Sequence, residues 1–129
     1  MPLSLLAIGI GAALGAILRW LLGLYLNSLN PALPYGTLTA NWLGAYLAGI
    51  AAIALTHYVD IAPQWRLFII TGFLGGLTTF STFSLEAVQL VHSQRWGMAI
   101  THIALHTGGS IVLTILGMLS MQWLLKSNR

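Results

Sequence analysis

The sequence predicts an all-α integral membrane protein, a single domain over residues 1–129 with four transmembrane helices. Hydrophobic residues make up 57% of the chain and charged residues only 5%, whereas about a quarter of a soluble domain is charged. Four apolar segments are each long enough for a spanning helix, which needs about 20 residues. These segments use nearly the whole chain, so we expect no separate soluble domain.

The charge and cysteine content exclude several classes of protein. The net charge of +3 comes from five basic and two acidic residues, which are scattered rather than clustered on one face as nucleic-acid binding requires. With no cysteine in the chain, neither a disulfide framework nor a cysteine-bearing metal site can form. We therefore expect the lipid bilayer, and not nucleic acid, to be the partner of most of the surface.

The first predicted helix covers residues 3–26 and the second covers residues 37–58. The N-terminus lacks the basic region of a signal peptide, so we expect the first segment to be retained. The linker NSLNPALPYG separates the two helices, because Asn, Pro and Gly favour turns. Asn41 lies early in the second helix, where its amide could donate to an ion in a path or make a hydrogen bond between helices. The loop VDIAPQ follows, and its Pro63 suits the start of the next helix.

The third predicted helix, residues 65–91, contains the unusual run GGLTTFSTFS. Gly75 and Gly76 are poor helix formers, and they predict a break near the middle of this helix. A break frees backbone carbonyls, which at membrane depth must be buried in protein or face a cavity. Such carbonyls, together with oxygens of Thr78 and Thr79, suit a small hard cation.

The same run places two aromatic rings and several hydroxyls after the break. Phe80 and Phe83 are three residues apart, so their rings lie on one side of the resumed helix. The positive edges of the rings could contact an anion, with Ser81, Thr82 and Ser84 as hydroxyl donors. A Phe pair at this spacing is also typical of core packing, and periodicity alone leaves both interpretations open.

The fourth predicted helix, residues 98–125, carries His102, His106, Ser110 and Thr114 at steps of four. Such residues stay near one helix face, so they form a stripe of polar groups. The hydroxyls could instead bond back to their own helix. His102 and His106 also have the i, i+4 spacing of a zinc-binding pair, although the sequence suggests no third ligand.

Arg19 and Glu86 are the clearest charged residues inside the predicted membrane segments. Arg19 could extend to the interface or supply positive potential at the vestibule of an anion path. Glu86 follows Thr79 and Thr82 on roughly the same helix face. Its carboxyl could carry protons, join a polar chain or make a structural hydrogen bond, so a proton-coupled transporter stays open as an interpretation.

The basic residues give almost no preference for one orientation in the membrane. Four spans place Arg66, Lys126 and Arg129 on one side, against Arg95 and Arg19 on the other. Because this difference is so small, the chain could insert both ways, which would allow an antiparallel dimer. The alternative is that the weak bias still sets a single orientation.

Small residues also recur four positions apart, as membrane helices require where their backbones approach closely. The pairs are Gly11 with Gly15, Gly44 with Ala48, and Gly72 with Gly76.

The segment GFLGGLTTFSTFSLE, from Gly72 to Glu86, resembles the signature of the Fluc (CrcB-type) fluoride channels of microorganisms. The resemblance extends to the Arg-Trp pair at Arg19, to GTLTANWLGA around Asn41 and to HTGGSIVLT around Ser110. It implies a passive, fluoride-selective channel, not an enzyme, in the inner membrane of a bacterial cell. It also implies a dual-topology antiparallel homodimer with two pores and a structural Na⁺ at the dimer axis.

The resemblance also implies roles for individual residues. Backbone oxygens of Gly75 and Thr78 would hold the Na⁺, and Arg19 would lie near the vestibule. The fluoride pore would be lined by Asn41, Phe80, Phe83, Ser81, Thr82, Ser110 and Thr114. We expect Thr79, Glu86 and His106 to support this polar track.

Two other functions stay open at this point. A small proton-coupled multidrug exporter would use Glu86 as its proton and substrate site, although the key glutamate of that family lies in the first helix and here the first helix has none. A non-transporting subunit of a membrane assembly would need neither Phe80 nor Asn41 for any flux.

Overall fold

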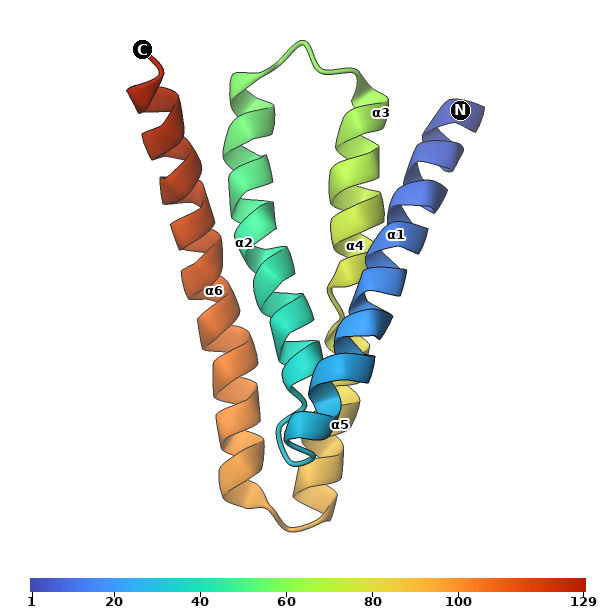
Figure 1. Cartoon of the computed structure of the whole chain (residues 1–129), viewed down its shortest axis with the longest axis vertical. Coiled ribbons are helices and arrows are strands. Elements are labelled where there is room, and N and C mark those ends of the chain that lie inside the picture. Colours follow the sequence, from blue (N-terminus) through green and yellow to red (C-terminus); the bar gives the residue numbers. More distant parts are fainter.

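The computed structural model describes residues 1–129 and contains four long helices that run side by side (Figure 1). All four are long and apolar enough to cross a membrane, which confirms the predicted all-helical, four-span architecture. The elements are α1 (Pro2–Leu26), η1 (Asn27–Leu29), α2 (Tyr35–His57), α3 (Pro63–Arg66), η2 (Leu67–Leu74), α4 (Gly75–Leu77), α5 (Phe80–His92) and α6 (Trp96–Ser127). The segments α3 to α5 together form the third span, Pro63–His92.

The helix ends lie within a few residues of the predicted positions, and local contacts explain the differences. Pro63 occupies the first turn of the third span, as its fixed φ angle favours. Helix α2 begins at Tyr35 because the Asn27 side chain caps it from the preceding helix. The Asn27 Oδ1 atom accepts hydrogen bonds from the backbone N–H groups of Gly36 and Thr37, at 2.7 and 3.2 Å.

Both termini and the α2–α3 connection lie at one end of the bundle, and the other two connections lie at the opposite end (Figure 1). Helix α6 runs beside α2, while α1 runs beside the upper part of the third span. The two outer helices, α1 and α6, diverge toward the end that carries the termini. The polar residues in the central part of the bundle therefore come from α2, α5 and α6.

Glycines allow the closest helix contacts, as the small-residue pairs predict. A Cβ atom on Gly15 of α1 would meet the backbone oxygen of Phe73, and one on Gly76 would meet the backbone of Ala12. The α2–α6 contact depends on Gly49 and Gly117 in the same way, and the sequence pattern did not single out these two. Backbone-to-backbone contact therefore holds both helix pairs together.

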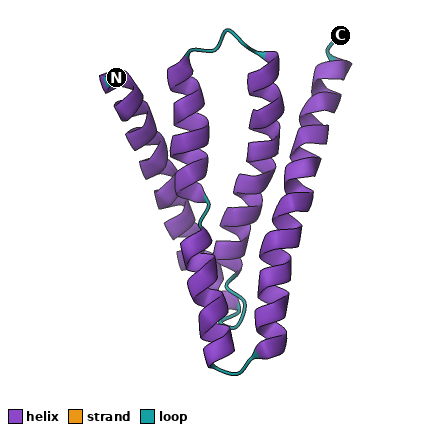
Figure 2. Cartoon of the chain, turned by 180° about the vertical axis from the view of Figure 1, so that it is seen from behind, coloured by secondary structure: helices purple, strands orange, loops and turns teal.

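The third span is interrupted at Thr78 and Thr79, which Figure 2 shows as a loop between two helical pieces. Both residues have extended backbones, with φ and ψ of −85° and 152° at Thr78 and of −148° and 120° at Thr79. The break was predicted, but its position at Gly75 and Gly76 was wrong, since both glycines belong to helix α4. At Gly76 the missing side chain serves contact with α1, while β-branched threonines suit the extended conformation.

Helix α5 starts immediately after the break because Thr79 caps it. The Thr79 side-chain oxygen accepts a hydrogen bond from the Thr82 backbone N–H at 3.1 Å. Upstream of the break, η2 is a stretch of wider π-helix, a form that occurs mostly at functional sites. The chain thus changes its helical geometry twice within one span.

Candidate functional site

Asn41 closes the break in the third span. Its Oδ1 atom accepts from the Thr79 backbone N–H at 2.7 Å, and its Nδ2 atom donates to the Thr79 carbonyl at 3.0 Å. In a continuous helix that N–H would donate to the carbonyl of Gly75, so the Gly75 carbonyl loses its usual partner. The side-chain amide replaces the missing helical bonds, and this agrees with the helix–helix interpretation of Asn41.

The second N–H of the Asn41 amide fixes the proton position on His106. The Asn41 Nδ2 atom lies 3.0 Å from Nδ1 of His106. An amide nitrogen only donates, so Nδ1 accepts and the neutral imidazole carries its proton on Nε2. That Nε2 atom is buried and has no hydrogen-bond partner in the chain, which leaves one N–H donor available beside the break.

Arg19 is held beside the break by a hydrogen bond to the third span. Its Nε atom donates to the carbonyl oxygen of Gly76 at 3.1 Å. In a continuous helix the Phe80 N–H would be the partner of this carbonyl. The guanidinium therefore places a positive charge beside the interruption, in addition to satisfying a freed backbone oxygen.

A cavity of about 520 Å³ opens at the break, between α2, the third span and α6. Eight of the predicted site residues line it: Asn41, Gly75, Thr78, Thr79, Phe80, Phe83, His106 and Ser110. Three others, Ser81, Thr82 and Thr114, and the vestibule residue Arg19, lie outside its wall. The structure therefore brings most, but not all, of the predicted residues to one chamber.

The two phenylalanines contact each other but differ in their surroundings. Their ring centroids are 5.4 Å apart with an edge-to-face tilt of 62°. Phe80 is 79% exposed on the surface of the chain, whereas Phe83 is 9% exposed. Phe83 stacks on His102 at 5.2 Å and tilts against His106 at 4.7 Å. One ring is thus a fixed wall of the cavity, and the other is presented outward.

The polar stripe of the fourth span lies partly on the site. His102 and His106 are buried, with 0% and 4% of their surface exposed. Ser110 lines the cavity. Thr114 bonds back to the Ser110 carbonyl at 2.9 Å and also reaches the Ala45 carbonyl at 3.2 Å, as the back-bonding interpretation predicts.

The hydroxyls after the break mainly organise the start of α5. The Thr79 hydroxyl donates to Thr82 Oγ1 at 3.1 Å and lies 3.3 Å from the hydroxyl of Ser81. Ser81 is exposed and Thr82 is half-buried. These three residues form one short network, which connects the cavity wall at Thr79 to the outer face of α5.

Glu86 is not bonded to Thr79 or Thr82, although it follows them on the helix. Its Oε2 atom instead accepts from the hydroxyl of Thr37 on α2, at 2.8 Å. Glu86 also lines a second, smaller cavity of about 150 Å³ near the α1–α2 and α5–α6 connections. The carboxyl therefore belongs to a different chamber from the one at the break.

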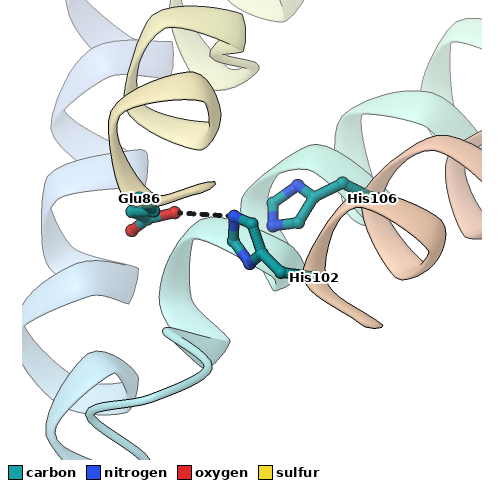
Figure 3. A group of neighbouring side chains, drawn as sticks. All are labelled: Glu86, His102 and His106. Atoms are coloured by element: carbon teal, nitrogen blue, oxygen red, sulfur yellow. Dashed lines mark ion pairs between the residues drawn. The ribbon is translucent and has the colours of Figure 1, made fainter. Parts of the chain in front are cut away.

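Glu86, His102 and His106 form a compact cluster, in which the three side chains point toward one another (Figure 3). The Glu86 Oε1 atom lies 3.6 Å from Nε2 of His102, and the two imidazole centroids are 4.4 Å apart. Glu86 lines the smaller cavity and His106 the larger one, so the cluster has one residue in the wall of each cavity.

Sequence analysis missed two contacts of this site. Thr37 lies one turn before Asn41 on the same helix face, and this spacing could have indicated it as a polar partner. The contact between Glu86 and the histidines joins different helices, and no spacing within either helix indicates it. Trp42 joins the second and fourth spans, because its Nε1 atom donates to the Leu105 carbonyl at 2.8 Å.

A bundle of four membrane-length helices, with a cavity at a broken helix and buried polar groups beside it, is the architecture of a multi-pass membrane protein of the channel and transporter class. The chain belongs to the CrcB family, because the family's sequence model, described as CrcB-like protein, Camphor Resistance (CrcB), matches residues 6–118.

Several relatives resemble the chain over almost its full length. A protein of Chromohalobacter salexigens named fluoride-specific ion channel FluC is 60% identical over 91% of this chain and 89% of that protein. Proteins with the same name from Pseudomonas paraeruginosa and Chromobacterium violaceum are 58% and 54% identical. These two matches cover 95% and 94% of this chain, and 96% of each relative.

Proposed function

We propose that this protein is a passive, fluoride-selective channel, which exports F⁻ across the bacterial inner membrane and so relieves fluoride toxicity. The cavity at the helix break supports this function most directly, because amide, hydroxyl, imidazole and aromatic groups converge there on one space. The names of the relatives select fluoride among the anions that such a cavity could accept.

Fluoride binds water tightly, so a pore must replace that hydration without trapping the ion. The hydroxyl of Ser110 is a donor on the wall of the cavity, and the edges of Phe80 and Phe83 add weakly positive carbon–hydrogen groups. His106 also lines the cavity, although its Nε2 atom is buried. Asn41 can offer an N–H to the anion only by releasing His106. Neutral donors of this kind favour entry and still permit exit.

The remaining polar residues would extend the path on both sides of this cavity. Ser81 and Thr82 continue the hydroxyl network along α5, and Thr114 continues the stripe along α6. The positive charge of Arg19 would make the electrostatic potential near the break more favourable for anions. Thr79 and Glu86 would hold the donors of the track in position.

We further propose that the working unit is an antiparallel homodimer with two pores. The larger cavity lies at the surface of a single chain, and Phe80 is exposed beside it. A second copy packed on this face would enclose the cavity and cover the ring. Each copy would then contribute one set of pore residues.

A structural Na⁺ at the dimer axis would fit the freed backbone oxygens of Gly75 and Thr78. The carbonyl of Gly75 has lost its helical partner to Asn41, and carbonyl oxygens are suitable ligands for a hard cation. When bound, the ion would supply a fixed positive charge between the two copies. Both residues also line the cavity, so this charge would act on the anion path.

Fluoride efflux from liposomes containing the purified protein tests the channel directly. Vesicles loaded with potassium fluoride receive a potassium ionophore, and an electrode records the released fluoride, with chloride efflux measured in parallel. We expect rapid fluoride loss and negligible chloride loss. Phe80→Ile should slow the fluoride flux at least about tenfold, because the ring edges are lost.

Phe68→Ile is the matched control, because Phe68 lies on the same span but outside the cavity. It should leave the flux unchanged. A folded protein with no fluoride flux would reject the channel. The proton-coupled exporter with Glu86 would then be tested by substrate-driven proton movement, which Glu86→Gln should abolish.

A further inference from the structure

The Glu86, His102 and His106 cluster has the composition of a metal site. Each residue offers one ligand atom, and these three atoms all lie within 4.8 Å of one another. The two histidines lie one turn apart on α6, and the carboxyl comes from α5 (Figure 3). The third ligand that the sequence did not reveal is thus supplied by a neighbouring helix.

Unsatisfied polar atoms give an independent indication that this cluster receives a ligand. The Oε1 atom of Glu86, Nδ1 of His102 and Nε2 of His106 are all buried without a hydrogen-bond partner in the chain. Buried polar atoms in proteins are rarely left unpaired. On His102 the nitrogen that faces the Glu86 Oε1 atom is Nε2, at 3.6 Å, and this atom also lies 3.3 Å from the Phe83 carbonyl oxygen. The unpaired atoms of Glu86 and His106 therefore support a shared ligand, with Nε2 as the nitrogen that His102 would offer.

We propose that Glu86, His102 and His106 bind a divalent transition-metal ion of the Zn²⁺ type. Two imidazoles and one carboxylate are a ligand set for zinc in sites that keep a fourth position open. Ligand atoms around one tetrahedral Zn²⁺ lie about 3.3 Å apart. The three ligand atoms lie within 4.8 Å of one another, so they would have to approach by at most about 1.5 Å to reach this spacing.

Metal binding changes the proton position on His106. Ligation through Nε2 requires the proton to move to Nδ1, where it faces the donating amide of Asn41. The Asn41 contact therefore opposes the ion. An Asn41→Asp change would reverse this, since a carboxylate accepts from Nδ1–H and strengthens a ligating histidine.

The position of the cluster indicates what the ion would do. Glu86 faces the smaller cavity and His106 the larger one, so an ion between them would separate the two chambers. A metal ion at this site would therefore close any path that joins the two cavities through the cluster.

Zn²⁺ binding to the purified protein in detergent tests the site without any flux measurement. The affinity tag is removed, the protein is treated with a chelator and desalted, and Zn²⁺ is titrated in competition with a chromogenic chelator. We expect one Zn²⁺ per chain. His102→Gln and Glu86→Gln should each weaken binding at least about tenfold, and Asn41→Asp should tighten it.

His92→Gln and His57→Gln are the matched controls, because these two histidines are exposed at helix ends and do not belong to the cluster. Neither should change the affinity. Co²⁺ in place of Zn²⁺ should give the visible absorption of a four-coordinate site in the wild type and lose it in His102→Gln. Gel filtration and circular dichroism verify that each variant is folded.

Unchanged Zn²⁺ affinity in both folded variants, or loss of binding in His92→Gln, would overturn the site. Zn²⁺ that slows fluoride efflux in the wild type but not in His102→Gln would support its place between the cavities. The binding result is independent of the channel. Zn²⁺ bound with no fluoride flux would reject the proposed function alone, and flux without Zn²⁺ binding would reject the metal site alone.

Discussion

At the residue scale, Asn41 connects the stability of the break to the chemistry of the cavity. Its amide satisfies both backbone groups of Thr79, and the remaining N–H sets the tautomer of His106. One side chain thus stabilises the break and keeps the proton of the His106 imidazole on Nε2, the nitrogen that does not face Asn41. This double use explains why an amide suits the position better than a carboxylate, which cannot donate.

Asn41→Asp separates these two uses. Asp can still accept from the Thr79 N–H, and from Nδ1–H of His106 once the imidazole changes its tautomer, but it cannot donate, so the Thr79 carbonyl loses its bond from residue 41 and the Nε2–H of His106 is lost. We expect a loss of about 1–3 kcal/mol in the free energy of unfolding, measured by thermal unfolding in detergent, together with slower fluoride efflux.

Asn27→Asp is the matched control for this change. Asn27 uses only its Oδ1 atom, which accepts from two N–H groups at the start of α2. Asp keeps this acceptor and adds a negative charge at a helix N-terminus, which is favourable. Equal destabilisation by the two changes would contradict the role assigned to the donated bonds of Asn41.

The sequence could predict which face of a helix is polar, but not which neighbouring helix packs against that face. The step of four placed His102, His106 and Ser110 on one side, and all three lie at the site. The contacts of Glu86 with Thr37 and with the histidines cross between helices. They depend on how three helices are rotated about their axes, and this is decided by packing that no single segment encodes.

At the element scale, the third span divides its tasks between two residue types. Gly72 and Gly76 let α1 approach the backbone, and the two threonines that follow form the break. Sequence analysis assigned both tasks to the glycines, because glycine is a poor helix former in isolation. Tertiary contact overrides that preference, since α1 packs against the span where its side chains are missing.

Gly15→Ala tests the contact between α1 and the third span. The added methyl group would meet the backbone oxygen of Phe73, which cannot rotate away as a side chain could. We expect a loss of about 1–3 kcal/mol in unfolding free energy, measured in detergent by circular dichroism. Gly9→Ala on the same helix meets no atom within 4 Å, so it should be neutral or stabilising by up to about 1 kcal/mol. A destabilising Gly9→Ala would show that the effect does not depend on this contact.

The four helices were predictable because length and hydropathy decide them locally. The ends of the helices were less predictable, since a capping side chain can come from a residue outside the helix that it caps. Asn27 belongs to the turn after α1, yet it determines the start of α2. Likewise Asn41 determines how the third span resumes.

At the scale of the whole molecule, the arrangement of charge and cavity bears on how copies assemble. Arg19 is held at the break, so the end with the α1–α2 connection has Arg95 alone, against Arg66, Lys126 and Arg129 at the other end. A difference of two basic residues is a weak orienting bias. The exposed cavity and Phe80 leave one face of each chain for a second copy.

We therefore predict that copies of the chain occur in both orientations in the membrane. The chain contains no cysteine, so a single introduced thiol reports its side without background. Asn128→Cys lies in the C-terminal tail and Ser93→Cys at the opposite end, and both positions are exposed. In intact cells an impermeant maleimide should label part of the copies of each variant, and the remaining copies should become labelled after permeabilisation. Full labelling of one variant with full protection of the other would mean a single orientation. It would exclude the antiparallel dimer, and with it the proposal that a second, oppositely inserted copy encloses the cavity at the break.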